Sequence, residues 1–235
     1  MENTEISPIK DKDLIKISVR NLVEFVLRTG DIDDRIGGGD SIKAMQEGTR
    51  IHKKLQARGG KNYHAEVPLK TVIPFEDYDL MIEGRADGLI YEERDISGEP
   101  MLTDAGGRDL PVDADIFSAS QITVDEIKGI YRDLDTMTEP VPLHLAQAKC
   151  YAYMIAKQNG LDSVDVRITY CNLDTEDVMR FLDNFSYEEL ASWFSRVIEL
   201  YRRWSDFSFY HKKSRNASIE VLEFPFDYRP GQRDL

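Results

Sequence analysis

Apolar residues recur at helical spacing in two segments near the start of the chain. Residues 18–28 carry the apolar stripe of an amphipathic helix, and Ser18 stands where it can cap that helix. A second stripe runs from Ile42 to Ala57, with Ser41 as its cap. His52 falls on the apolar face of this second helix. We therefore expect its ring to turn inward, either as a hydrogen-bonded core histidine or as a metal ligand.

Strand periodicity follows these helices. Residues 63–73 and 80–91 alternate between apolar and polar side chains and predict a hairpin joined by residues 74–79. A third strand is expected over residues 122–129. Residues 93–120, between the second and third strands, are rich in Gly, Asp and Ser, so we expect an insertion there.

The second half of the chain alternates between helix and strand again. We expect a helix over 143–157 that ends at Gly160, strands over 164–172 and 178–185, a long helix from a Ser186–Glu189 capping box to about Trp204 or beyond, and a strand or extended tail over 219–226. This order of elements predicts an α/β protein with a central sheet flanked by helices.

The composition is typical of a soluble globular protein. The 235 residues are 41% hydrophobic and 31% charged, and no apolar run approaches the ~20 residues of a membrane-spanning helix. The first 13 residues are polar and lack the apolar core of a signal peptide, so we expect a cytoplasmic protein that contacts no membrane. Cys150 and Cys171 are expected to be reduced core thiols, and two cysteines are too few to hold an iron–sulfur cluster within one chain.

A net charge of −13 argues against a general nucleic-acid binder, whose affinity comes from neutralising phosphates. Basic residues are nevertheless clustered in two places. The first cluster comprises Lys43, Arg50, Lys53, Lys54, Arg58 and Lys61, and the second comprises Arg202, Arg203, Lys212, Lys213 and Arg215. Solvated helix faces and local nucleic-acid contacts both account for such clusters.

Candidate chemistry centres on residues 124–129, which form a strand that ends in a turn. Because side chains alternate across a strand, Glu126 and Lys128 share one face, while Asp125 and Ile127 point to the other. An acid and a lysine placed this way can hold a cation and position a water beside it. An exposed, cross-paired strand face would show the same pattern.

Other positions add to this candidate site. Asp87 lies near the middle of a predicted strand, where burial is costly unless the carboxylate is paired or bound to a metal. Gly84 in the same strand predicts the close approach of another group. Gly48 stands one turn before His52 and is expected to leave room for its ring. Gln147 and Tyr151 are four residues apart and share one helix face.

Four short segments stand in a recognisable order: Gly48-Thr49-Arg50-Ile51-His52, Gly84-Arg85-Ala86-Asp87, Asp125-Glu126-Ile127-Lys128 and Gln147-Ala148-Lys149-Cys150-Tyr151. Together they resemble the PD-(D/E)xK nuclease superfamily, in particular its RecB-like branch with lambda-exonuclease-type relatives. The resemblance implies a restriction-endonuclease-like core, a central mixed sheet flanked by helices in the order αβββαβ, with an N-terminal helix and a long C-terminal helix. It implies a nuclease domain over 1–226 with 93–120 as an insertion.

The resemblance also implies roles for single residues. His52, Asp87 and Glu126 would be metal ligands, joined by the backbone carbonyl of Ile127. Lys128 would orient or activate the attacking water, so that the catalytic set is Lys128, Glu126 and Asp87. Contacts to the nucleic acid are implied for Gln147, Tyr151 and Arg50. The cysteine cluster of many relatives is absent from this sequence, so no iron–sulfur cluster is implied.

The choice of metal follows from the ligand types. Mg²⁺ prefers oxygen ligands and commonly takes one or two carboxylates plus waters, and a histidine in the set favours acceptance of Mn²⁺ as well. Such a cation polarises a phosphate and lowers the pKa of a water, as phosphodiester hydrolysis requires. A zinc site built from His52, His64, Cys150 and Cys171 is the competing idea, but its spacing matches no zinc motif.

The C-terminal segment 224–232 resembles the segment that opens the helicase core of XPD/DinG-type helicases. This resemblance implies that 227–235 is a linker to, or the start of, a helicase domain in cis. No nucleotide-binding loop is present, so we expect no ATP hydrolysis by this chain.

These observations lead to one functional expectation and one alternative. We expect a Mg²⁺- or Mn²⁺-dependent deoxyribonuclease with exonuclease or flap-type activity, acting on single-stranded DNA or duplex ends as the nuclease module of a helicase in repair or recombination. The alternative is a catalytically inactive domain of a helicase that binds nucleic acid or serves as a scaffold. The −13 charge motivates this alternative, whereas the intact set of His52, Asp87, Glu126 and Lys128 argues against it.

Overall fold

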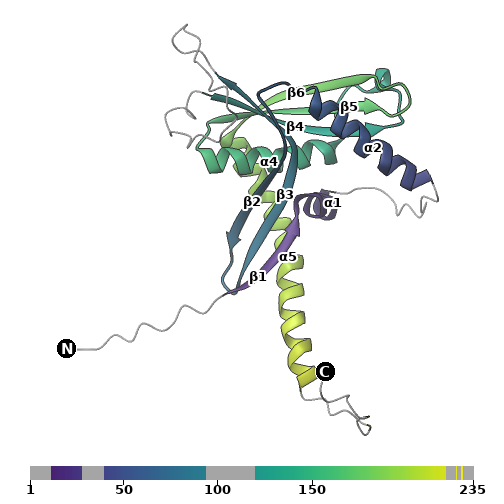
Figure 1. Ribbon diagram of the computed structural model, residues 1–235. Coiled ribbons are helices and arrows are strands. Elements are labelled where there is room, and N and C mark those ends of the chain that lie inside the picture. Colours follow the sequence, from purple (N-terminus) through teal and green to yellow (C-terminus); the bar gives the residue numbers. More distant parts are fainter. Residues whose placement is uncertain (1–11, 28–39, 94–119, 221–225, 227–228, 230–235) are drawn as a thin grey trace. The chain divides into compact units, whose positions relative to one another are not determined.

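A single mixed sheet organises the chain. The computed structural model describes residues 12–27, 40–93, 120–220, 226 and 229 (Figure 1). The strands are β1 (Asp13–Ser18), β2 (Tyr63–Pro74), β3 (Tyr78–Glu93), β4 (Ser120–Ile130), β5 (Ser163–Asn172) and β6 (Val178–Ser186). The helices are α1 (Val19–Leu27), α2 (Asp40–Ala57), α4 (Pro142–Asn159) and α5 (Tyr187–Glu220), with a short 3₁₀ turn at Leu134–Thr136. The expected α/β fold with a central mixed sheet, flanking helices and a long C-terminal helix is confirmed.

Local capping signals place several element ends where the sequence predicts them. The Ser18 hydroxyl accepts a hydrogen bond from the backbone N–H of Asn21 at 3.1 Å and caps α1. Gly160 ends α4 in the left-handed conformation, with φ 63°. Ser186 and Glu189 form the reciprocal capping box of α5, with distances of 2.9 and 3.2 Å.

Three local expectations are wrong. Strand β1 was not expected, because its residues acquire a strand partner only through parallel pairing with β3, where Ile15 lies opposite Leu80. Helix α2 begins at Asp40, so Ser41 lies within the helix and not at the expected cap position before it. Ile219 belongs to the last turn of α5, so no strand begins there, and residues 221–225 of the expected tail lie outside the described residues.

The sheet order is β1-β3-β4-β5-β6, with β2 also paired to β3. Strand β3 pairs with β2 along nearly its whole length, from Asp79 to Ile90. On its other side it changes partner: residues 78–83 pair with β1, and residues 88–93 pair with β4. Residues 84–87 lie between these two ladders. The middle of β3 is therefore the one part of the strand at which other groups can approach its free backbone edge.

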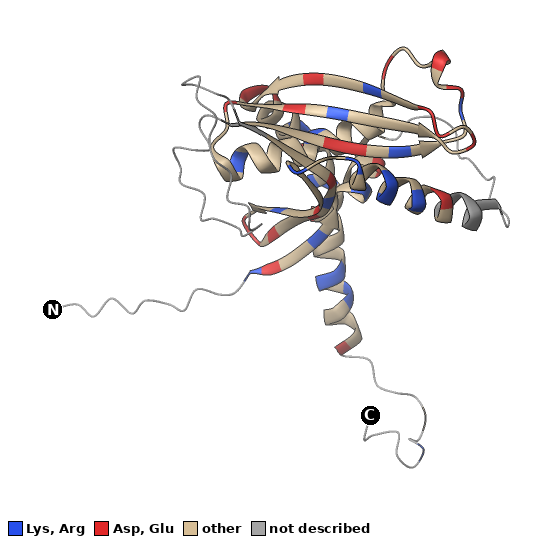
Figure 2. Cartoon of the chain, turned by 45° about the horizontal axis from the view of Figure 1, so that its top comes forward, with Lys and Arg blue, Asp and Glu red and all other residues tan. Residues whose placement is uncertain are grey.

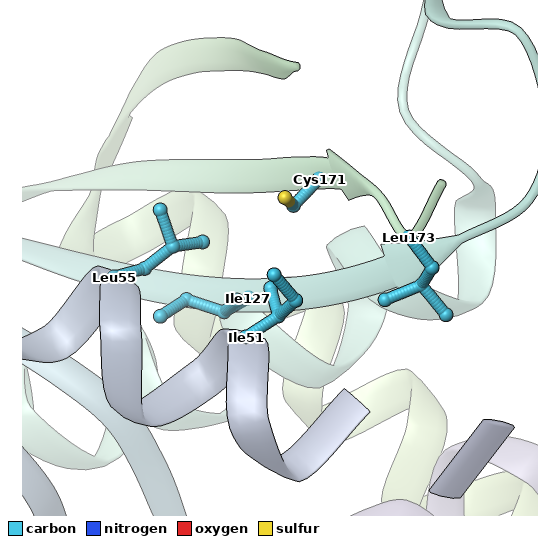
Figure 3. Close-up of a cluster of buried hydrophobic side chains, with 5 residues drawn as sticks. All are labelled: Ile51, Leu55, Ile127, Cys171 and Leu173. Atoms are coloured by element: carbon cyan, nitrogen blue, oxygen red, sulfur yellow. The ribbon is translucent and has the colours of Figure 1, made fainter. Parts of the chain in front are cut away.

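Helices α2 and α4 cover opposite faces of the sheet. Ile127 of β4 is fully buried against Ile51 and Leu55 of α2 in an apolar cluster that Cys171 and Leu173 complete (Figure 3). The neighbouring residue Lys128 donates a hydrogen bond to Gln147 of α4 at 3.3 Å. Because adjacent residues of a strand point to opposite faces, these contacts place α2 and α4 on different sides of β4.

The chain divides into two compact units, residues 1–197 and residues 198–235, and the division falls within α5. In the first unit, the start of α5 packs on α4, where Tyr153 stacks on Phe194 with ring centroids 4.1 Å apart. The second unit contains the rest of α5. The expected boundaries at 226/227 and around the 93–120 insertion stay predictions, and residues 94–119 lie outside the described part of the chain. None of the described helices combines the length and the apolar character that a membrane crossing requires.

Candidate active site

Asp87 sits at the point where β3 changes partner. The β3–β4 ladder ends with the pair of Gly88 and Asp125, and the strands do not continue as a ladder beyond it. Beyond this pair, a side chain of β3 provides the hydrogen bond to β4: Asp87 Oδ2 accepts from the backbone N–H of Ile127 at 2.8 Å. This bond ties the acid to the strand that carries Glu126 and Lys128. Burial raises the pKa of Asp87 above its ordinary value.

His52 lies on helix α2 and approaches Asp87 of the sheet from there. Ile51, its neighbour in α2, is 1% exposed and anchors the helix on Ile127. The His52 ring then lies beside the sheet, with Nδ1 3.6 Å from Asp87 Oδ1. The expectation that the His52 ring turns inward is confirmed, and its role as a metal ligand stays a prediction. Gly48 is not needed for this, because a methyl group added at Gly48 would meet nothing within 4 Å.

Glu126 is a buried carboxylate that lacks hydrogen-bond donors in the described part of the chain. Its side chain is 1% exposed, and neither carboxylate oxygen receives a directed hydrogen bond from the described residues. The Lys128 ammonium lies 2.6 Å from Oε1, so this contact is an ion pair without hydrogen-bond geometry. Burial raises the pKa of Glu126 to about 8, while the charge of Lys128 lowers it in part. A buried carboxylate without directed donors is the arrangement that a bound cation would complete.

This burial predicts a pH-dependent stability in the metal-free protein. The ordinary glutamate pKa is 4.5, so between about pH 4.5 and 8 the folded chain holds a proton that the unfolded chain releases. The free energy of unfolding therefore falls as pH rises through that window. Glu126→Gln removes this titration, so the variant's melting temperature should exceed that of the wild type by more at about pH 8 than at about pH 5.

The comparison uses thermal unfolding in chelator, which keeps metal from binding either protein. Asp183→Asn serves as the control, because Asp183 is an exposed carboxylate on β6. Parallel pH profiles of the wild type and Glu126→Gln would contradict the assigned environment of Glu126.

Helix α4 supports Lys128 through two further side chains. Gln147 accepts the hydrogen bond from the Lys128 ammonium, and the Gln147 side chain is also hydrogen-bonded to the Tyr151 hydroxyl. Tyr151 is 3% exposed and hydrogen-bonds the backbone of Arg85. Its ring occupies the space that Gly84 leaves, because a methyl group at Gly84 would lie 2.7 Å from the hydroxyl oxygen. The expected close approach at Gly84 is therefore confirmed, and Tyr151 is the group that approaches.

Gly84→Ala should displace Tyr151 and lower the stability of the protein. The added methyl group overlaps a buried ring, a change that typically costs about 1–3 kcal/mol. The measurement is thermal or denaturant unfolding. Gly48→Ala is the matched control, because its methyl group meets open space on a helix and should be neutral or stabilising. Equal stability of Gly84→Ala and the wild type would show that the Tyr151 ring is not held against the strand.

Glu66 was missed by the sequence analysis. It lies opposite Asp87 in the β2–β3 register, between the pairs Ala65–Gly88 and Val67–Ala86, and its φ of 57° is rare for a residue with a side chain. Its Oε1 accepts a hydrogen bond at 3.0 Å from Gln56, whose amide also donates to the Asp87 carbonyl oxygen. The expected hairpin with turn 74–79 already pairs residue 73 with residue 80. Extending that register would have placed Glu66 opposite Asp87.

Potential metal-ligand atoms gather at this place. Among the described residues, one group has ligand atoms that all lie within 4.8 Å of one another, and it comprises His52, Glu66 and Asp87. Glu126 is not part of this group and instead pairs with Lys128. The group contains neither His64 nor a cysteine, and Cys150 and Cys171 are both buried. The competing zinc idea thus has no support in the described residues.

Arg50 lies on the exposed side of α2. Its guanidinium is paired with Glu47 and with Glu176, each at 2.8 Å. Lys54 is also paired with Glu176, so this acid neutralises part of the first basic cluster. A nucleic-acid contact of Arg50 stays a prediction that must compete with these two carboxylates.

Comparisons with known proteins find solved structures of similar fold but no protein that assigns an activity to this chain. No protein-family model matches the chain, and no curated protein matches it. Among solved structures, the chain is similar to the crystal structure of SSO0001, with 15% identity, coverage of 94% of this chain and 83% of that chain, and a TM-score of 0.44. It is also similar to an alkaline exonuclease, LHK-Exo, from Laribacter hongkongensis, with 13% identity, coverage of 86% and 94%, and a TM-score of 0.46. At these scores, neither likeness carries an argument about what this chain does.

Proposed function

We propose that this chain is a divalent-metal-dependent deoxyribonuclease whose site is formed by Asp87, Glu126, Lys128 and His52. The observation that carries the proposal is the buried Glu126 carboxylate, which has no directed hydrogen-bond donor and lies 2.6 Å from the Lys128 ammonium. A buried acid and a half-buried acid that lie with a histidine and a lysine at one break in a sheet are costly for stability. They are suited to holding a cation and a water next to a phosphodiester.

Each residue has a distinct role in this proposal. Asp87, Glu126 and His52 would hold Mg²⁺ or Mn²⁺, with the Ile127 carbonyl as a further ligand and Glu66 as an added candidate. A cation bound there would polarise the phosphate and lower the pKa of a bound water. The Lys128 ammonium holds the attacking water in line and offsets the charge of Glu126. Gln147 fixes the position of Lys128 through their 3.3 Å hydrogen bond, and Tyr151 fixes Gln147.

The finer parts of the proposal rest on sequence motifs. The resemblance of the four motifs to RecB-like nucleases supports exonuclease activity on single-stranded DNA or duplex ends. Association with a helicase in repair or recombination rests on residues 224–232, of which the structure describes Phe226 and Arg229. An iron–sulfur cluster is not part of the proposal.

The proposal is tested by incubating the purified chain with end-labelled single-stranded and duplex DNA. We expect cleavage in Mn²⁺ or Mg²⁺ and none in chelator, and the product ladder distinguishes removal of nucleotides from an end from internal cuts. A parallel RNA substrate tests the choice of nucleic acid. Binding of DNA without cleavage in either metal would overturn the proposal and favour the alternative of a catalytically inactive nucleic-acid-binding domain.

A further inference from the structure

A second polar pocket lies on the α2 side of the sheet, opposite the face that carries Lys128. Its volume is about 360 Å³, within the ~300–1,000 Å³ range of ligand sites. We call it the arginine pocket. Its lining residues are Leu55, Arg58, Gly59, Tyr63, Asp125, Arg167, Thr169, Val178 and Arg180.

The floor of the arginine pocket is a fixed polar network on neighbouring strands. Asp125 of β4 lies opposite Arg167 of β5, and the guanidinium holds both carboxylate oxygens at 2.8 and 2.9 Å. The Thr169 hydroxyl donates to the same carboxylate at 2.6 Å, and the Tyr63 hydroxyl donates to it at 3.2 Å. Asp125 is 2% exposed. These bonds occupy Asp125, which is the one acid among the described residues that line the pocket, and place Arg167 in one orientation.

The rim of the pocket carries uncompensated positive charge. Arg58 follows the end of α2, and Arg180 lies on β6 directly opposite Thr169. Among the described residues, neither guanidinium has an ion-pair or hydrogen-bond partner, in contrast to Arg50 and Lys54 of the same basic cluster, which Glu176 neutralises. With Asp125 offset by Arg167, the lining retains an excess of two positive charges. Lys and Arg recur along the described part of α2 (blue in Figure 2).

Tyr63 connects the arginine pocket to the candidate active site. Its hydroxyl lies 3.2 Å from Asp125 Oδ2 and 3.5 Å from the backbone oxygen of Asp87. The ring is seated over Gly88, where a methyl group would lie 2.1 Å from the ring. Tyr63 of the pocket lining therefore also lies beside the backbone of Asp87, whose carboxylate belongs to the candidate site.

We propose that the arginine pocket binds a phosphate group of a nucleic-acid strand, next to the phosphodiester that the site receives. This inference rests on the proposed function for its substrate class. Arginine is the side chain best suited to phosphate because its planar fork offers several donors at once. On a chain with net charge −13, two arginines that have no partner among the described residues concentrate positive potential beside a polar pocket, where an anion can bind. The volume admits a phosphate together with part of its nucleotide.

The test measures binding of fluorescent single-stranded DNA in chelator, so that cleavage does not interfere. Arg58→Ala/Arg180→Ala should weaken binding roughly tenfold at ~0.1 M salt and reduce the salt-dependence slope by about 0.7 for each arginine. Arg20→Ala is the control, because it removes one charge from an exposed arginine of α1 that pairs with Glu24. The double lysine variant, Arg58→Lys/Arg180→Lys, should retain the wild-type salt slope. Melting temperatures verify that each variant is folded, and the two single alanine variants replace the double variant if it is not.

Oligonucleotides with a 5′-phosphate, with a 3′-phosphate and with neither separate the two sources of the ligand. An equal loss on all three identifies a backbone phosphate, whereas a loss confined to one terminally phosphorylated strand identifies that terminus. Unchanged affinity of the alanine variants on all strands, or no DNA binding by the wild type, would overturn the inference. Because binding is measured without metal, weakened binding in a chain that proves unable to cleave DNA would uphold the pocket while the proposed nuclease activity fails.

Discussion

Asp87→Asn should lose Mn²⁺ binding and DNA cleavage together. Asparagine keeps an oxygen that can accept the 2.8 Å hydrogen bond from Ile127 N–H, so the strands should stay in place. It removes the negative charge 3.6 Å from His52 and beside Glu126, which is the charge that a cation needs. Because even indirect changes around a metal commonly cost 10–100-fold in affinity, loss of a direct ligand should cost about 100-fold or more.

Isothermal titration with Mn²⁺ measures this loss, and the cleavage assay measures its consequence. Asp79→Asn is the matched control, because Asp79 lies on the same strand and loses the same charge away from the site. The metal-free variant should be at least as stable as the wild type, since burial disfavours the Asp87 carboxylate. Wild-type affinity for Mn²⁺ in Asp87→Asn would remove Asp87 from the ligand set.

Lys128→Ala should lose cleavage but keep Mn²⁺ binding. The ammonium lies 2.6 Å from Glu126 and 3.3 Å from Gln147, where it can hold a water but cannot bind a cation. Positioned proton-transfer and water-holding groups contribute typically 10²–10⁴-fold to a rate, so a loss of that order is expected. Lys70→Ala, on the exposed side of β2, is the control for the change of charge.

The two readouts separate this role from a structural one. If calorimetry shows that Lys128→Ala loses Mn²⁺ binding as well as activity, then Lys128 supports the metal ligands and not the attacking water. Lys128→Arg should restore the ion pair with Glu126 but not the rate, because the larger planar guanidinium holds a water differently.

The order of elements could be predicted because each long segment has a clear period and clear capping residues. Ser18, Gly160 and the Ser186–Glu189 pair mark helix ends through local hydrogen bonds that the sequence alone specifies. Strand β1 could not be predicted in the same way. Leu14 in that strand is 46% exposed, and the strand exists because β3 offers a free edge, which is a tertiary effect.

Part of the candidate site was predictable because the periods of the strand and the helix determine which side chains share a face. The alternation of β4 correctly separates Glu126 and Lys128 from Ile127, and helical spacing correctly turns His52 toward Asp87. Glu66 was not identified, because the register of the expected hairpin was not extended to it; that register places it opposite Asp87, although its left-handed backbone interrupts the strand alternation. The pairing of Asp125 with Arg167 depends on the parallel register of β4 and β5, which follows only from the assembled sheet.

Anomalous scattering from crystals soaked in Mn²⁺ would locate the proposed metal centre directly. We expect a peak bounded by the carboxylates of Asp87 and Glu126 and the imidazole of His52, with the Lys128 ammonium moved off Glu126 to an adjacent water. A saturated crystal with no peak there, or with a peak that leaves the buried Glu126 carboxylate without a ligand contact, would contradict the proposed nuclease site.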